Sequence, residues 1–224
     1  MKREIIITSD GSTTIRLPEW SEQYHSKHGA IQEAYHVFIK NGLEICTKPE
    51  VSILEIGFGT GLNAFITFLT SEKQTHKIRY NGVEAYPIAK QEVEQLNYIT
   101  ALNAHAFREQ FYLIHNIPWE ERKNISDNFS LVKRKLFFHE ITDKNEFDLV
   151  YFDAFGARVQ PELWTEDIFA KMYDAMKDGG VLVTYSAKGS VRRAMQTVGF
   201  RVERLPGPPG KREMLRAVKV VGDI

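Results

Sequence analysis

Four acidic residues in this chain stand close to the ends of segments that resemble buried strands. They are Glu55, Glu84, Glu140 and Asp153, in the segments at 51–56, 77–84, 136–141 and 146–153. An open α/β sheet places its ligand at the carboxyl ends of its strands, so we expect these carboxylates to lie at such a site. Carboxylates accept hydrogen bonds from hydroxyl and amino groups, and they can exchange protons. The pattern therefore indicates a site for a nucleoside-like ligand.

A glycine-rich turn follows the segment at 51–56 and leads into a predicted helix. The sequence EIGFGTGLN occupies residues 55–63, and apolar residues then recur at helical spacing. Glycine tolerates positive φ and lets a ligand lie against the backbone. A dinucleotide fingerprint, G-x-G-x-x-G, would need glycine three residues after Gly59, where this chain has Leu62. The Gly-Lys-Ser/Thr of a phosphate loop is also absent from the turn. The E-x-G-x-G-x-G form is typical of class I S-adenosylmethionine (SAM) methyltransferases. The residues expected to contact SAM here are Glu55, Gly57, Gly59, Gly61 and Asn63.

The other acids have separate expected roles. Glu84 lies 23 residues beyond Gly61, where an acid at the tip of the second strand binds the ribose hydroxyls. Glu140, at the tip of the third predicted strand, is placed to accept from an adenine amino group. Asp153, at the tip of the fourth, is expected to contact SAM beside its methyl group and is the candidate catalytic residue.

Composition excludes several classes of protein. The 224 residues are 43% hydrophobic and 26% charged, which is typical of a soluble globular protein with room for one α/β domain. No apolar run is long enough for a membrane span or a signal-peptide core, and we expect a cytoplasmic protein. Cys46 is the single cysteine, which excludes intrachain disulfides. His25, His28 and His36 lack the Cys or carboxylate partners of a metal site, so no metal is expected.

Charge is balanced overall but uneven along the chain. The formal net charge is zero, which argues against a protein that coats nucleic acid. Residues 188–219 nevertheless contain nine Lys or Arg against two Glu, an excess of seven positive charges. This segment is either a local basic patch or a solvated face whose charge is balanced elsewhere.

The predicted elements form one Rossmann-like domain with an extension. Residues 4–17 predict a β-hairpin around Asp10-Gly11, followed by a polar substrate-side loop and a helix at 30–40. We divide the chain into residues 1–28, the hairpin and loop, and residues 29–224, the methyltransferase domain. The fold class is α/β, a class I SAM-dependent methyltransferase (Rossmann-like) sheet with an N-terminal β-hairpin extension.

The remaining segments complete this sheet. Residues 86–133 contain helical pattern and an irregular piece near 116–122, interpreted as an insertion on the substrate side. Beyond the strands at 136–141 and 146–153, a helix at 165–176 is predicted to end at a glycine C-cap at 177–180. A strand at 181–185, a helix at 190–198 and an antiparallel pair at 200–205 and 214–221 follow.

Over nearly its whole length the chain resembles the methyltransferase domain of the MnmC family of bacterial tRNA-modifying proteins. The resemblance lies in these segments: YHS at 24–26 with Gly29 and Glu33, EIGFGTGLN at 55–63, DAF at 153–155, PELWT at 161–165, SVRR at 190–193, Gly199-Phe200 and GKREML at 210–215. The chain departs from the family pattern at His139-Glu140, where members often carry Gly-Asp, and in the loop after Phe155. The resemblance implies transfer of a methyl group from SAM to the aminomethyl group of 5-aminomethyl-2-thiouridine at the tRNA wobble position.

The resemblance also implies partners and roles. In many bacteria the domain is fused to an FAD-dependent oxidase; that half is missing from these 224 residues, so no FAD is expected and another enzyme must supply the aminomethyl substrate. tRNA is the expected partner, with other wobble-uridine modification enzymes as further candidates, and no membrane. Asp153 would bind and orient the amine, whose proton leaves to water or through a desolvated Asp153. The residues expected to contact the substrate are Tyr24, His25, Phe155 and Trp164 in the pocket and Lys188, Arg192, Arg193, Lys211 and Arg212 on anticodon-stem phosphates.

Two alternatives stay open. The first is an aminopropyltransferase of the spermidine synthase type, which shares the fold and binds decarboxylated SAM. Such an enzyme would favour a more acidic pocket for its polyamine substrate, and the basic C-terminal segment argues against it. A non-catalytic SAM-fold protein that binds RNA is the second, although Glu55, Glu84 and Asp153 are all present.

Overall fold

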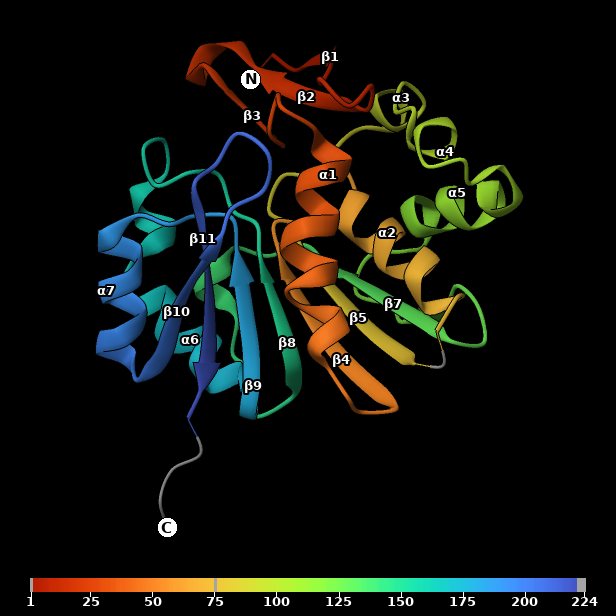
Figure 1. The fold of residues 1–224 in the computed structure, drawn as a ribbon. Helices are drawn as coiled ribbons and strands as arrows, with labels where there is room; N and C mark the ends of the chain where they lie inside the picture. The colour runs from red at the N-terminus through yellow and green to blue at the C-terminus, as the bar shows by residue number, and fades with distance from the viewer. Residues whose placement is uncertain (1, 75, 221–224) are drawn as a thin grey trace.

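An eight-stranded sheet forms the centre of the molecule (Figure 1) in the computed structural model, which describes residues 2–74 and 76–220. In their order across the sheet, its strands are β10 (Phe200–Pro206), β11 (Glu213–Lys219), β9 (Met176–Thr184), β8 (Phe147–Phe152), β4 (Glu50–Ile56), β5 (Lys77–Val83), β7 (Phe129–Arg134) and β6 (Lys123–Asn124). The five strands from β9 to β7 run parallel, and β11, β10 and β6 are antiparallel to their neighbours. The predicted mostly parallel α/β sheet is therefore confirmed.

Chain order reverses at β4, and this fixes where a ligand can bind. β4 pairs with β5, the next strand of the large sheet along the chain, on one side and with β8 on the other. The crossovers therefore diverge from this point, and a crevice opens at the carboxyl ends of β4 and β8. The glycine turn and Asp153 follow these two strands directly.

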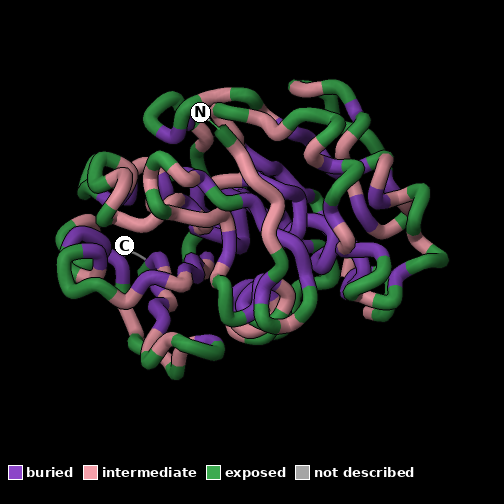
Figure 2. Tube along the Cα trace, turned by 90° about the horizontal axis from the view of Figure 1, so that it is seen from above, coloured by how far each residue is buried: buried purple, intermediate pink, exposed green. Residues whose placement is uncertain are grey.

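Helices cover both faces of the sheet. The α-helices are α1 (Ala30–Ala34), α2 (Leu62–Ser71), α3 (Lys90–Val93), α4 (Tyr98–Ala101), α5 (Arg108–Asn116), α6 (Glu166–Ala175) and α7 (Gly189–Val198), and the π-helical turn η2 (Tyr35–Lys40) continues α1. Figure 1 shows α1 and α2 in front of the sheet, α6 behind it and α7 at the left, beside β10. Every residue of α2 is buried, because the strands lie under it and α1 and α5 pack over it. Figure 2 shows buried residues concentrated along the central strands.

Short 3-10 turns join several of these elements. They are η1 (Pro18–Trp20), η3 (Leu43–Ile45), η4 (His105–Phe107), η5 (Phe138–Glu140) and η6 (Pro161–Trp164). Among the described residues, no helix is both long enough and apolar enough to cross a membrane.

A small N-terminal sheet lies across the upper edge of the large sheet (Figure 1). β1 (Glu4–Ile7) and β2 (Thr13–Leu17) form the antiparallel hairpin expected at 4–17, and β3 (Glu22–Gln23) pairs with β2. The Arg3 guanidinium donates to the Tyr86 carbonyl oxygen at 2.7 Å and to a Glu92 carboxylate oxygen at 3.0 Å. Arg158 pairs with Glu22 at 3.0 Å on the other side. The small N-terminal sheet is thus held by contacts on both sides of the crevice.

The strand predicted at 136–141 is wrong. The third parallel strand is β7 (Phe129–Arg134), and Phe138–Glu140 instead forms the 3-10 turn η5. The sequence did not predict β7, because Lys133 interrupts its apolar pattern. Lys133 is nevertheless buried: its ammonium donates to the His115 carbonyl oxygen and lies 5.0 Å from the centre of the Trp119 ring. The burial of such a lysine depends on partners elsewhere in the chain, so the hydrophobicity of its own segment does not predict it.

The glycine C-cap predicted at 177–180 is also wrong. α6 ends at Ala175 and β9 begins at Met176, without an intervening turn. Phe147 pairs with Met176, but Leu149 pairs with Val181, so β9 carries extra residues here. Gly179, at φ +72°, lies in this irregularity, which is a bulged strand rather than a helix end.

The other predicted elements need smaller adjustments. Residues 86–133 contain the helical elements α3, α4, η4 and α5, and residues 117–122, between α5 and β6, lie outside the helices and strands, as the sequence predicted. The strands β6 and β7 follow this irregular piece. The C-terminal antiparallel pair is present as β10 and β11, and Val221, assigned to it from sequence, lies outside the described residues.

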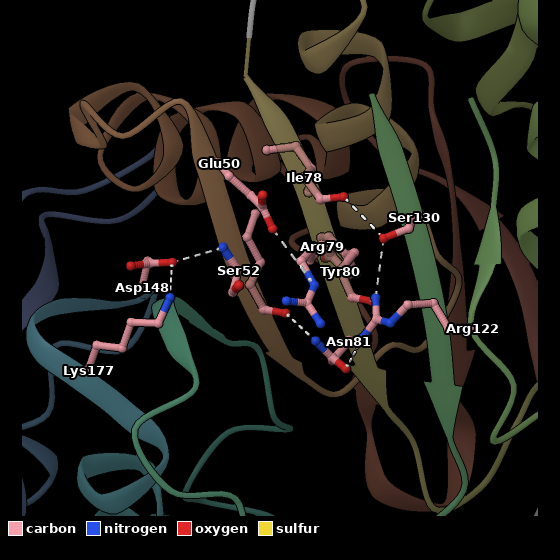
Figure 3. Close-up of polar contacts among 11 residues, drawn as sticks. Glu50, Ser52, Ile78, Arg79, Tyr80, Asn81, Arg122, Ser130, Asp148 and Lys177 are labelled. Atoms are coloured by element: carbon pink, nitrogen blue, oxygen red, sulfur yellow. Dashed lines mark hydrogen bonds and ion pairs between the residues drawn. The ribbon is translucent and has the colours of Figure 1, made fainter. Parts of the chain in front are cut away.

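A polar cluster occupies the sheet near the opposite, amino-terminal ends of the strands (Figure 3). Arg122 lies across β5 and donates to the Asn81 amide oxygen at 2.8 Å. Asp148, near the start of β8, accepts from Lys177 at 2.8 Å and from the Ser52 backbone at 3.0 Å. The polar groups of this cluster therefore supply hydrogen-bond partners for one another.

Candidate active site

A cavity of about 330 Å³ lies at the carboxyl ends of β4, β5 and β8, beneath the N-terminal sheet. Such a volume is within the usual range for small-ligand sites. The residues that line the cavity come from segments spread along the chain between Arg3 and Tyr185. They are Arg3, Leu17, Trp20, Gln23, Tyr24, His25, Gly57, Phe58, Gly59, Leu62, Asn63, Glu84, Ala85, Tyr86, Phe137, Phe138, His139, Asp153, Ala154, Phe155, Gln160, Glu162, Leu163 and Tyr185.

The glycine turn forms a close-fitting floor. Gly57 has φ +89°, and a Cβ there would lie 2.6 Å from the Asp153 carbonyl oxygen, so no larger residue fits. Gly59 has φ +49°, and a Cβ would lie 3.0 Å from the Tyr24 ring. Gly61 caps the start of α2 but does not line the cavity. The turn therefore leaves backbone, not side chains, facing the ligand.

Glu84 is fixed at the tip of β5. Its two carboxylate oxygens accept from the backbone N–H of Gly59 at 2.9 Å and of Tyr86 at 2.8 Å. These bonds hold the carboxylate against the glycine turn while leaving lone pairs for hydroxyl groups. The position matches that expected for a ribose-binding acid.

One amide bridges the two remaining carboxylates. The Asn63 side-chain nitrogen donates to Glu55 at 2.9 Å and to Asp153 at 2.8 Å. The second carboxyl oxygen of Glu55 and the amide oxygen of Asn63 are buried without a hydrogen-bond partner among the described residues. The structure thus brings Glu55, Asn63 and Asp153 together: Asn63 and Asp153 line the cavity, whereas Glu55 is fully buried and does not line it.

Both acids bind protons more tightly than usual. Burial raises the pKa of Glu55 well above its ordinary value, despite the hydrogen bond from Asn63. Burial, followed by the charge of Glu33, raises the pKa of Asp153 to about 7; the Asn63 hydrogen bond and the Lys211 charge act in the opposite direction. A carboxyl group that titrates near neutral pH in a cleft can exchange protons during a reaction.

Aromatic rings line the cavity beside Asp153. Phe155 meets Tyr24 at 5.0 Å and Trp20 at 5.8 Å between ring centroids, both edge to face. His25 also lines the cavity, and its Nδ1 lies 3.0 Å from the Thr14 hydroxyl. Burial lowers the pKa of His25 to about 4, so the ring is neutral at physiological pH.

Sequence reasoning missed Trp20, Gln23 and Tyr185. All three line the cavity. Trp20 and Gln23 precede the Tyr24-His25 segment, and Tyr185 directly follows β9. Their positions next to segments expected at the site were the signal by which the sequence could have identified them.

Trp164 lies in the core and does not line the cavity. It packs at 5.0 Å from Phe152 between ring centroids, and its indole N–H donates to the Phe155 carbonyl oxygen at 2.7 Å. Trp164 therefore holds the loop that carries Phe155, rather than facing a substrate.

Glu140 also lies apart from the cavity. It is exposed, and its carboxylate accepts from the Phe137 backbone N–H at 2.6 Å in the turn η5. The turn instead presents His139 stacked on Phe137, with 5.5 Å between ring centroids. The failed strand prediction explains the difference, because a turn points its side chains differently from a strand.

The basic residues divide into two groups. Lys188, Arg193 and Arg212 are exposed, and Arg192 is half-buried on α7. Lys211 instead pairs with the buried Glu33 at 2.5 Å, so it is not available on the surface in the way the sequence predicted. Within the described ranges, no cluster of three or more His, Cys, Asp or Glu side chains is arranged for a metal ion.

Comparisons with known proteins agree with this geometry. A family model described as S-adenosyl-L-methionine-dependent methyltransferase matches residues 102–220. The chain is 29% identical over 219 residues to the tRNA 5-methylaminomethyl-2-thiouridine biosynthesis bifunctional protein MnmC of Marinomonas sp. (strain MWYL1), covering 88% of this chain and 31% of that protein. The chain spans about a third of the length of the curated relatives it matches.

Solved structures also resemble this chain. The crystal structure of MNMC2 from Aquifex aeolicus matches with a TM-score of 0.76 and 25% identity, covering 97% of this chain and 70% of that one. A spermidine synthase in complex with a transition state analogue matches with a TM-score of 0.62 and 17% identity, over 98% and 71% of the two chains, which is a likeness of fold. The family model covers more than half of this chain, which therefore belongs to the S-adenosyl-L-methionine-dependent methyltransferases.

Proposed function

We propose that this enzyme transfers a methyl group from SAM to the aminomethyl group of 5-aminomethyl-2-thiouridine at the wobble position of tRNA. Asp153 carries the proposal, because its carboxyl group accepts from Asn63 in the wall of the cavity and has a pKa of about 7. The names of the MnmC relatives supply the nucleoside, and their similarity extends over most of this chain.

The floor of the cavity suits SAM. When bound, SAM supplies an electrophilic methyl group on its sulfonium. Gly57 and Gly59 would lie under it, and Glu84 would accept from its ribose hydroxyls. Asn63, held from behind by the buried Glu55, would contact its polar end. The aromatic surface of Phe137 and His139 offers a place for a flat base.

Asp153 would bind the substrate amine and take its proton. A primary alkylamine has a pKa near 10, so it arrives charged and must lose a proton before it can attack. An ordinary Asp, with a pKa near 4, is a poor base, whereas a pKa of about 7 is close to the operating pH. Asp153 also fixes the direction of the nitrogen, and such alignment is the main requirement of an in-line displacement.

The surrounding surfaces fit a cationic group on a nucleotide. The rings of Tyr24, Phe155 and Trp20 stand beside Asp153 and can face an ammonium or sulfonium. The exposed Lys188, Arg193 and Arg212, together with Arg192, would contact tRNA phosphates. We assign residues 1–28 to the substrate-side extension and 29–224 to the methyltransferase domain, and we place the protein in the cytoplasm with its tRNA.

The test is a transfer assay with defined products. The purified chain is incubated with methyl-labelled SAM and tRNA from a strain lacking it, and the nucleosides are analysed after digestion. We expect label in 5-methylaminomethyl-2-thiouridine with wild type and none with Asp153→Asn. Label in a different nucleoside would overturn the assigned substrate.

Parallel arms separate the alternatives. Reaction of decarboxylated SAM with a diamine would indicate an aminopropyltransferase instead. Binding of tRNA without any transfer, under conditions where SAM binds, would indicate a non-catalytic RNA-binding protein.

A further inference from the structure

Lys211 links the C-terminal strand pair to the wall of the active site. It lies in the loop between β10 and β11, and its ammonium nitrogen is 2.5 Å from a Glu33 carboxylate oxygen on α1. The same nitrogen lies 3.8 Å from the centre of the Tyr185 ring. A cation held by a buried carboxylate and an aromatic face is well fixed.

The surrounding backbone is packed closely around this contact. A Cβ on Gly210 would lie 2.4 Å from the His28 ring, so the loop sits directly on the segment before α1. The other Glu33 oxygen accepts from the Ser26 backbone N–H at 3.1 Å. The Tyr185 hydroxyl donates at 2.8 Å to the carbonyl oxygen of Ala154, the residue after Asp153.

Several titratable groups on different elements interact electrostatically with Asp153. They are Glu33 on α1, Glu55 on β4, Tyr80 on β5, Tyr185 after β9 and Lys211 in the β10–β11 loop. Lys211 is the cation of this set. Without its charge, Glu33 would stand as a second carboxylate near Asp153, with no ammonium beside it.

We propose that Lys211 is a positioning residue for methyl transfer: it neutralises Glu33 beside Asp153 and holds Tyr185 and the Ala154 backbone in place. Its catalytic consequence rests on the proposed function, because Asp153 must be the group that takes up the amine proton. Its electrostatic part concerns the protein alone. The two parts can therefore be tested separately.

The first experiment follows the Asp153 carboxyl carbon by NMR during a pH titration of protein labelled at aspartate, with Asp153→Asn used to assign the signal. Loss of the cation in Lys211→Met should move the Asp153 titration upward by about one pH unit. Loss of the anion in Glu33→Gln should move it downward. Lys211→Arg should restore the wild-type value.

Two further variants keep the test independent of folding. Lys211→Met leaves a buried carboxylate unpaired and can fail to fold, whereas Lys211→Met with Glu33→Gln removes both charges and should titrate between the single variants. Lys144→Met breaks an exposed Lys–Asp pair of the same 2.5 Å length and should leave the Asp153 titration unchanged. Unchanged Asp153 titration in both Glu33→Gln and the double variant would overturn the proposal.

The second experiment measures kcat/KM for tRNA methylation against pH. The acidic limb should move in the same directions as the NMR titration, upward in Lys211→Met and downward in Glu33→Gln. If the titration moves while wild-type enzyme methylates no tRNA, the proposed function fails and the electrostatic role of Lys211 stands. If wild type methylates tRNA and the limb does not move, the role of Lys211 in the reaction is wrong.

Discussion

β8 carries an aspartate near each end, and the two have opposite surroundings. Asp148 accepts from Lys48 at 2.6 Å, Lys177 at 2.8 Å and the Ser52 backbone at 3.0 Å, two of which are drawn in Figure 3. Among the residues that the structure describes, Asp153 accepts from one side chain, that of Asn63. Burial opposes ionisation at Asp148, but its three donors outweigh it and lower the pKa; at Asp153 burial dominates and raises the pKa to about 7.

The difference separates a structural acid from a reactive one. Burial raises the pKa of both carboxyl groups, so their neighbours decide the outcome: two lysine ammonium groups and a backbone N–H at Asp148, against one amide donor and the nearby charge of Glu33 at Asp153. A carboxylate with its hydrogen bonds satisfied stabilises the fold and is poorly suited to proton exchange. A carboxyl group with few hydrogen-bond donors, in the wall of a cavity, can still bind a substrate group and exchange a proton with it.

Removing the carboxyl group at the reactive end should have the largest effect. We expect Asp153→Asn to lower kcat for methyl transfer about 10²- to 10⁴-fold, because the amine loses its base. SAM affinity, measured by calorimetry, should change only a few-fold, since Glu84 and the glycine turn remain. Wild-type turnover in this variant would show that both ends of β8 are structural.

Removing the charge at the paired end should affect stability instead. Asp148→Asn is expected to lower the free energy of unfolding by about 1–3 kcal/mol, because the buried Ser52 N–H and two ammonium groups lose a charged acceptor. The measurement is urea unfolding, with methyl transfer per folded molecule unchanged. Asp174→Asn, which breaks an exposed pair with Lys144, is the matched control and should cost less than about 0.5 kcal/mol.

The two ends should also respond to pH with opposite sign. The unfolded chain titrates its aspartates near pH 4, so folded Asp153 binds a proton more tightly and its contribution to stability falls as pH rises from about 4 to about 7. The contribution of Asp148 is present above about pH 4 and is lost as pH falls. Urea midpoints between pH 3 and 8 for wild type and the two Asn variants measure both slopes. Parallel slopes would contradict the assignment.

The smallest effects should come from the lysines around Asp148. Lys48 and Lys177 are 58% and 38% exposed, so Lys48→Met and Lys177→Met should each cost less than about 1 kcal/mol in urea unfolding, with Lys177→Met the larger. Each single variant leaves Asp148 one ammonium partner. The double variant should cost more than the sum, because the carboxylate then loses both.

How well the sequence predicted each residue depended on the range of the interactions that place it. Gly57, Glu84 and Asp153 stand where the apolar runs and glycine spacing put them, because a strand end and a tight turn are set by neighbours in the chain. Glu140 was misplaced because the apolar residues around it form a turn rather than a strand. Trp164 was expected to face the substrate, but its packing against Phe152 places it in the core.

The sequence by itself determined the fold class, the glycine floor and the places of Glu84 and Asp153 at the strand ends, since each follows from local patterns in the chain. Only the tertiary structure decided which charged groups are paired. Lys211 reads as a surface cation in its own segment, yet it pairs with Glu33, 178 residues away. Coulomb energy and desolvation depend on distances between side chains in space, and those distances exist only once the sheet has brought both ends of the chain to one site.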